Sequence, residues 1–76
     1  MPALPAVKDS GAVRVVSVGG ARGYRRRLLE LGFMPGTELR VVRRQVAGGT
    51  LEIEVRGGRV SLRSVEAAVI EVEPLG

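Results

Sequence analysis

The sequence predicts a mainly β fold, a small closed or partly open barrel of five strands with one short α-helix inserted between strands 1 and 2. Three observations lead to this prediction. Five short runs of aliphatic residues are either β-branched or alternate with polar residues. Glycine-rich turns separate most of these runs, and barrel closure would hide their edges. Only 3% of the 76 residues are aromatic, so the core must be aliphatic, which favours strands.

The elements at the start of the chain follow from composition. Residues 1–11 contain proline and glycine and are interpreted as a lead-in, which places the domain at residues 12–74. The run AVRVVSV at 12–18 is β-branched and is the first predicted strand. The loop GGARG at 19–23 could cradle an anion on its backbone N–H groups, but it lacks the spacing of a phosphate-binding loop. A strand-to-helix turn explains its glycines better.

The helix is predicted at residues 24–31, where Tyr24, Leu28 and Leu31 have helical spacing. Gly32 is expected to end it, because glycine accepts the left-handed conformation that follows many helices. The segment MPG that comes next predicts a tight turn, with proline presetting φ and glycine accepting a positive φ after it.

The second half of the chain is predicted to be strands joined by short turns. The strands are expected at 38–44, 51–56, 59–63 and 69–73, with a loop at 47–49, a two-residue hairpin turn at Gly57-Gly58 and one helical turn at 64–67. A single turn before the last strand is typical of SH3-like barrels, so the predicted class is an SH3-like five-stranded barrel.

Alternation also predicts which side chains face outward. Leu39 and Val41 would share one face of their strand, with Arg40, Val42 and Arg44 on the other. Glu52 and Glu54 would both face outward. Pairing with arginines on neighbouring strands explains them better than a metal site does, and the candidates are Arg40, Arg44, Arg59 and Arg63.

Composition removes several classes of function. The chain has no Cys and no His, which excludes a disulfide framework, thiolate metal sites and the usual catalytic triads. We therefore expect neither an enzyme nor a cofactor, and we assign no metal ligand. No apolar run reaches the roughly 18 residues of a membrane helix, and the N-terminus does not resemble a signal peptide. We expect a cytoplasmic protein that does not insert into the membrane.

The net charge of +4 is concentrated in residues 22–44, which carry a net +5. Such a stretch could bind nucleic acid or steer a protein partner. Nucleic acid would require exposed aromatics or polar base-reading side chains, and the helix has no Asn, Gln, Ser or Thr. Both aromatics, Tyr24 and Phe33, fall within or beside the apolar helix pattern. The pattern disfavours nucleic acid, although a solvated basic face remains an alternative.

The apolar residues of the helix and turn point towards protein docking. Adjacent leucines point in different directions, so a short helix cannot bury all of them. An apolar groove rimmed by arginine is typical of docking surfaces, whereas a helix that only plugs one barrel end is the plainer alternative. The candidate partner-binding residues are Arg22, Arg25, Arg26, Leu28, Leu29, Phe33, Met34 and Pro35.

The blocks RRLLELGFMPGTELRVVRR, LEIEVRG, VSLR and EAAVIEVEP resemble, in the same order, the FeoA family of bacterial ferrous iron transport accessory proteins. The resemblance covers residues 12–74. It implies an SH3-like barrel that docks on the cytoplasmic GTPase-containing domain of the FeoB transporter, which would recruit it to the inner face of the membrane. Weak association into a homo-oligomer is kept as an alternative. The alternative function is a regulatory module that binds nucleic acid or acts within an iron-dependent repressor system.

Two segments depart from the family pattern. The segment QVAGGT at 45–50 stands where members often carry a loop of the Pro-Leu-Gly-Asp-Pro type, and Gly58 stands where a bulky residue is usual. The resemblance therefore does not carry over to this chain any contact that the family makes through the first of these loops.

Overall fold

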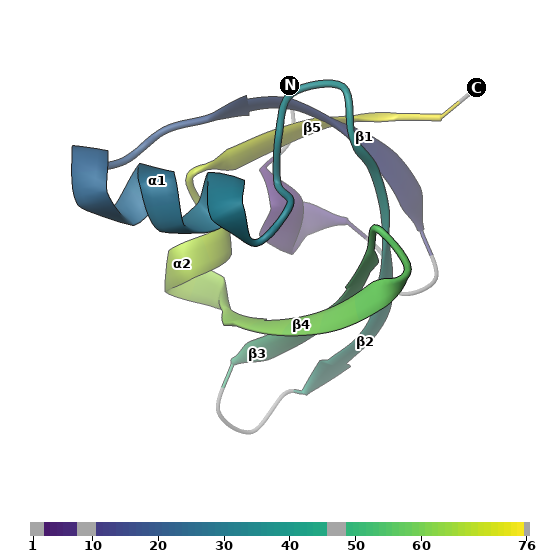
Figure 1. Ribbon diagram of the computed structural model, residues 1–76. Helices are drawn as coiled ribbons and strands as arrows, with labels where there is room; N and C mark the ends of the chain where they lie inside the picture. Colours follow the sequence, from purple (N-terminus) through teal and green to yellow (C-terminus); the bar gives the residue numbers. More distant parts are fainter. Residues whose placement is uncertain (1–2, 8–10, 46–48, 76) are drawn as a thin grey trace.

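The computed structural model describes residues 3–7, 11–45 and 49–75, and Figure 1 shows their arrangement. Five antiparallel strands form one sheet in the order β4-β3-β2-β1-β5. The mainly β prediction is confirmed. In chain order the elements are the 3-10 helix η1 (Leu4–Ala6), β1 (Ala12–Val18), α1 (Arg22–Glu30), β2 (Glu38–Gln45), β3 (Thr50–Val55), β4 (Gly58–Arg63), α2 (Ser64–Ala67) and β5 (Ile70–Pro74).

The sheet curls around its core but does not close by hydrogen bonding (Figure 1). In the described part of the chain, β4 and β5 are the two edges and no ladder joins them. Of the closed and partly open barrels that the sequence allowed, the closed form is therefore wrong. The turn α2 connects the two edge strands, and η1 contacts both α2 and β5, which covers part of the gap between the edges.

Sixteen hydrophobic residues form one buried cluster inside this curl. The alternation of β3 is as predicted, because its three aliphatic side chains are all buried. The buried residues are Leu4, Val7, Val13, Val15, Val18, Leu28, Phe33, Leu39, Val41, Leu51, Ile53, Val55, Leu62, Ala67, Ile70 and Val72. A thin core of this kind is typical of small domains, so each buried residue contributes a large share of the stability.

Part of the predicted lead-in belongs to this core. Leu4 is fully buried and Val7 nearly so, and Ala3 forms an isolated antiparallel bridge with Glu71 of β5. The structure thus places residues 3–7 on the domain, whereas the prediction began it at residue 12. Residues 8–10 and 46–48, the latter overlapping the loop predicted at 47–49, lie outside the described residues.

A bulge in β2 changes the predicted faces of its arginines. The register with β3 shifts between Val41 and Arg43, so Arg43 lies opposite Glu52 and Arg44 lies opposite the buried Leu51. Strict alternation had placed Arg44 on the outer face with Arg40, and the extra residue overturns that. The Arg44 guanidinium instead donates to the backbone carbonyls of Pro5 and Val7, which fastens the N-terminal segment to the sheet.

The hairpin between β3 and β4 turns one residue earlier than predicted. Val55 pairs with Gly58, so the two turn residues are Arg56 and Gly57 rather than two glycines. Their φ angles of 54° and 78° are both positive, as a tight two-residue hairpin of the primed type requires. Arg56 therefore belongs to the turn and not to the outer face of the strand.

Candidate functional site

The candidate site is the loop between α1 and β2, whose conformation is closely specified by hydrogen bonds. The N–H of Phe33 donates to the carbonyl of Leu28 at 3.1 Å, and the N–H of Gly32 donates to that of Leu29 at 3.0 Å. This pair of bonds is a Schellman motif, and Gly32 holds its left-handed position with φ of 111°. The predicted helix stop is confirmed.

The second half of the loop is a tight turn tied to β1. The N–H of Thr37 donates to the carbonyl of Met34 at 2.9 Å, with Pro35 and Gly36 between them. Gly36 has φ of 91°, as the third residue of a type II turn requires, which confirms the predicted turn. Val15 of β1 makes two further bonds of 2.8 Å with the turn, one to Gly36 and one to Thr37. The loop is thereby held against the sheet.

In this loop conformation, some of the predicted docking residues are buried and others are exposed. Leu28 and Phe33 are 1% and 0% exposed, because the Schellman motif brings both side chains into the core. They offer no surface to a partner, so their inclusion in the docking set is corrected. Met34 is 45% exposed, Pro35 is exposed and Leu29 is half-buried.

Leu31 is a docking candidate that the sequence reasoning counted among the apolar helix residues but did not include in the partner-binding set. It is 37% exposed at the end of α1, close to Met34 in the chain. The described residues contain one other large exposed hydrophobic side chain, Val65 of α2 at 76%. We call Leu31, Met34 and Pro35 the loop ledge. The sequence signal for the loop ledge was a run of more adjacent apolar residues than a short helix can bury.

The arginines of α1 do not act as one patch. Arg25 donates from its Nε to the backbone carbonyl of Val18, the last residue of β1, at 2.8 Å. Arg26 lies 3.9 Å from Glu30 one turn later on an exposed face. Arg22 is exposed at the start of the helix, which begins two residues before its predicted start. The helix thus brings Arg22 and Arg26 to the surface, while Arg25 also stabilises the fold.

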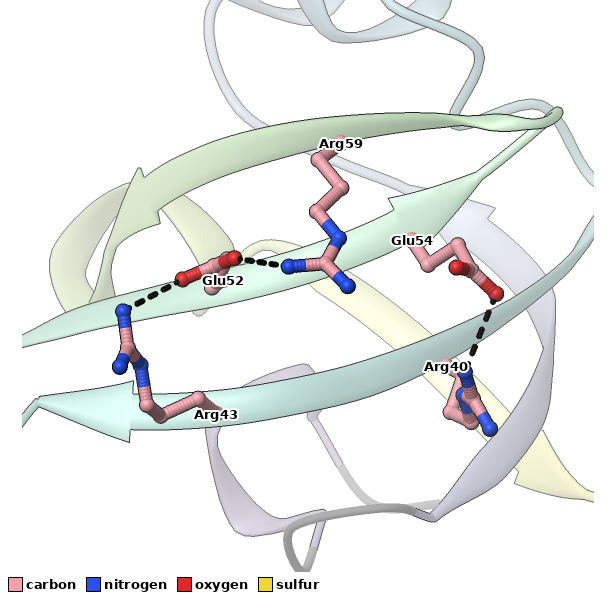
Figure 2. A network of polar contacts seen from close by, with 5 residues as sticks. All are labelled: Arg40, Arg43, Glu52, Glu54 and Arg59. Carbon is pink, nitrogen blue, oxygen red and sulfur yellow. Dashed lines mark hydrogen bonds and ion pairs between the residues drawn. The ribbon is translucent and has the colours of Figure 1, made fainter.

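Three strand arginines are paired with two glutamates on the outer face of β2, β3 and β4 (Figure 2). Glu52 lies between Arg59 at 2.8 Å and Arg43 at 3.1 Å, and Glu54 lies 3.3 Å from Arg40. Pairing by Arg40 and Arg59 confirms the cross-strand prediction. The bulge puts Arg43 in the place predicted for Arg44, and Arg63 pairs with Glu66 of α2 instead. Two of the seven arginines of the basic stretch, Arg40 and Arg43, are therefore paired with glutamates within the sheet.

The ion pairs at Glu52 predict an acid-dependent contribution to stability. The hydrogen bond from Arg59 lowers the pKa of Glu52 below its ordinary value of 4.5, desolvation opposes this effect, and Arg43 lowers the pKa further. A carboxyl group whose pKa is lowered by folding stabilises the fold above its unfolded pKa and loses this contribution as pH falls through its folded pKa. Glu52→Gln should therefore flatten the decline of stability below about pH 4.5.

Urea unfolding from about pH 6 to about pH 3 measures this dependence. The matched control is Glu30→Gln, which removes an exposed carboxylate 3.9 Å from its arginine. Curves for Glu52→Gln that run parallel to the parent curve over this pH range would contradict the assignment.

A shallow groove of about 380 Å³ opens beside the loop between β3 and β4. Its lining combines aliphatic residues with both signs of charge. The lining residues are Ala12, Glu38, Leu39, Arg40, Glu54, Arg56, Gly57 and Leu75. The sequence reasoning singled out neither the groove nor Arg56, because the hairpin was placed one residue too late.

Other kinds of site find no support in the described residues. They contain no group of three or more His, Cys, Asp or Glu side chains that could hold a metal ion. Phe33 is fully buried and Tyr24 packs against the core, so neither ring is placed to stack on bases. Neither α-helix in the described ranges has the length and apolar character needed to cross a bilayer.

Comparison with known proteins gives a consistent result. The family model of the FeoA domain matches residues 3–74. The FeoA protein of Chlorobium tepidum is 32% identical, with a TM-score of 0.90 over 99% of this chain and 71% of that one. The FeoA protein of Stenotrophomonas maltophilia, solved with zinc and described as a prokaryotic SH3 domain protein, is 32% identical, with a TM-score of 0.84 over 96% of this chain and 91% of that one.

A second class of structure shares the fold. A manganese-dependent transcriptional repressor in complex with manganese is 26% identical, with a TM-score of 0.89 over 97% of this chain and 36% of that one. In that protein the matching part is about a third of a longer chain. Together the likenesses support the predicted SH3-like fold and associate it with both iron transport and metal-dependent repression.

Proposed function

The chain belongs to the FeoA family, which is linked to ferrous iron transport, and we propose that it docks on the cytoplasmic GTPase-containing domain of a FeoB-type transporter. In this proposal it acts as an accessory protein at the inner face of the membrane, without catalysis of its own. The observation that supports docking is the loop ledge, where Leu31 and Met34 expose apolar surface on a backbone held by the Schellman motif and by Val15.

A pre-formed apolar ledge suits a protein partner. Because the loop is already ordered, little conformational entropy is lost when a partner binds it. The exposed Arg22 and Arg26 would contribute mainly to the rate of encounter, since charges at the rim of an interface steer association more than they strengthen it. Leu29, half-buried on the same helix, would complete the contact.

The direct test is a calorimetric titration of the protein with the cytoplasmic GTPase-containing portion of the transporter from the same organism, with and without GTP. We expect saturable binding that persists between about 0.1 M and about 1 M salt, where the Debye length falls from about 10 Å to about 3 Å. The same titration with duplex DNA tests the regulatory alternative, because phosphate binding falls steeply and log-linearly with salt. Salt-sensitive binding to DNA without binding to the transporter would overturn the proposal.

The substitution Met34→Asp should weaken transporter binding by about tenfold or more, because it places a desolvated charge in an apolar contact. It should change the free energy of unfolding by only about 0.5 kcal/mol, since Met34 is 45% exposed. The matched control is Val65→Asp, at an exposed position on α2. Equal losses of binding in both variants would show that the ledge is not the contact.

A further inference from the structure

Arg56 occupies a backbone conformation that arginine disfavours. Among the described residues, Arg56 is the one non-glycine residue with a positive φ, at 54°. It lies in a turn where asparagine or glycine is preferred. Strain of this kind persists where the surrounding structure imposes it, and it is concentrated at functional sites. The position of the arginine therefore requires an explanation beyond turn formation.

The aliphatic part of the exposed Arg56 side chain lies close to Gly32 of the candidate docking loop. A Cβ atom added to Gly32 would lie 2.9 Å from the Cδ of Arg56 and 3.7 Å from Val55. The bare glycine therefore makes room for the aliphatic part of the arginine, which lies across the loop that carries the ledge.

Arg56 also lines the groove as a cation that no described carboxylate pairs with. The two glutamates in the groove already have partners: Glu54 lies 3.3 Å from Arg40 (Figure 2) and Glu38 lies 3.7 Å from Arg14. Within residues 3–7, 11–45 and 49–75, neither a hydrogen bond nor an ion pair of the Arg56 side chain is found. The groove thus offers one arginine for an external anion.

We propose that Arg56 binds a side-chain carboxylate of an extended, acidic partner segment that lies in the groove. The exposed Ala12 and the half-buried Leu75 would contact the aliphatic parts of that segment. A guanidinium recognises a carboxylate through paired hydrogen bonds. A singly charged carboxylate suits the groove better than a more highly charged phosphate, because the nearby Glu38 and Glu54 would repel the larger charge.

The test uses the full chain, labelled with ¹⁵N, and four defined probes followed by NMR. The first is an acetylated, amidated heptapeptide of leucine, glutamate and glycine, and the second is its glutamine counterpart. The third is the glutamine peptide with a free C-terminal carboxylate, and the fourth is inorganic phosphate. We expect saturable shifts of the Leu39, Arg40, Gly57 and Leu75 amides with the glutamate peptide, and much smaller shifts with the other three.

Two variants separate recognition from folding. Arg56→Gln and Arg56→Asn should each weaken binding of the glutamate peptide roughly tenfold or more while the remaining spectrum keeps its dispersion. Asparagine tolerates the left-handed conformation, so the second variant preserves the turn. The control is Arg27→Gln, an exposed arginine that is outside the groove and the ledge. Equal binding of the glutamate and glutamine peptides, or unchanged binding in both Arg56 variants, would overturn the proposal.

Only the identity of the partner as a transporter domain rests on the proposed function, and the two ideas can fail separately. Transporter binding that Arg56→Gln leaves unchanged would refute the groove and keep the docking proposal. Arginine-dependent peptide binding without transporter binding would do the reverse. Binding of the free-carboxylate peptide alone would identify a chain terminus as the ligand, and binding of phosphate alone would identify an anion of another class. Either result would overturn the side-chain assignment.

Discussion

Replacing Leu28 with alanine is expected to lower the free energy of unfolding by about 2–5 kcal/mol, because it opens a cavity in the core. Leu28 is 1% exposed and lies beside the fully buried Phe33 at the end of α1. Stability scales to about 4–11 kcal/mol for a chain of this length, so the loss should be a large share of the total. Urea unfolding followed by circular dichroism measures the change.

The control for this prediction is Leu31→Ala, three residues further along the chain at the C-cap of α1. Leu31 is 37% exposed, so its loss should cost much less stability but should weaken transporter binding. The sequence allowed Leu28 to serve either the core or a partner. An unchanged midpoint for Leu28→Ala combined with lost binding would return it to the partner surface and contradict the structure.

The substitution Gly32→Ala should destabilise the fold by about 1–3 kcal/mol, because an L-residue is strained at its φ of 111°. The new methyl group would also displace the side chain of Arg56, whose Cδ lies 2.9 Å from the Cβ position. Gly36→Ala is the control, since its φ of 91° carries similar strain but nothing lies within 4 Å of its Cβ position. Thermal unfolding of both variants separates the two effects.

A double-mutant cycle with Arg56→Ala isolates the contact. If the methyl group and the arginine collide, removal of the arginine should recover part of the cost, and coupling between touching residues is typically about 0.5–3 kcal/mol. Additive effects of Gly32→Ala and Arg56→Ala would contradict the packing of the arginine over the loop.

Local patterns were sufficient to predict most elements of the fold. Alternation placed the strands and their buried faces, as in β3, and the glycine after the helix identified its end. These features depend on residues that are neighbours in the chain, so a single sequence reveals them. The pairs of Glu54 with Arg40 and of Glu52 with Arg59 were predictable because the neighbouring strands could be inferred, whereas the Arg43 partner of Glu52 was not predicted.

The remaining features depend on contacts between distant residues. The bulge near Val42 leaves no mark on the apolar pattern, yet it exchanges the roles of Arg43 and Arg44. Burial of Leu4 depends on contacts of η1 with α2 and β5, which are distant in the chain. Sorting buried from exposed leucines around Gly32 likewise required the Schellman motif in three dimensions. The candidate site was therefore predictable as a segment, but its exposed members were not.

The most direct test of the docking account is a chemical-shift map of the ¹⁵N-labelled protein bound to the cytoplasmic GTPase-containing domain of its transporter. The account predicts that the largest shifts and line broadening occur from Leu31 to Gly36 and at Arg56. It predicts little change on the ion-paired outer face around Glu52. Shifts confined to that ion-paired face, with the ledge unchanged, would contradict it.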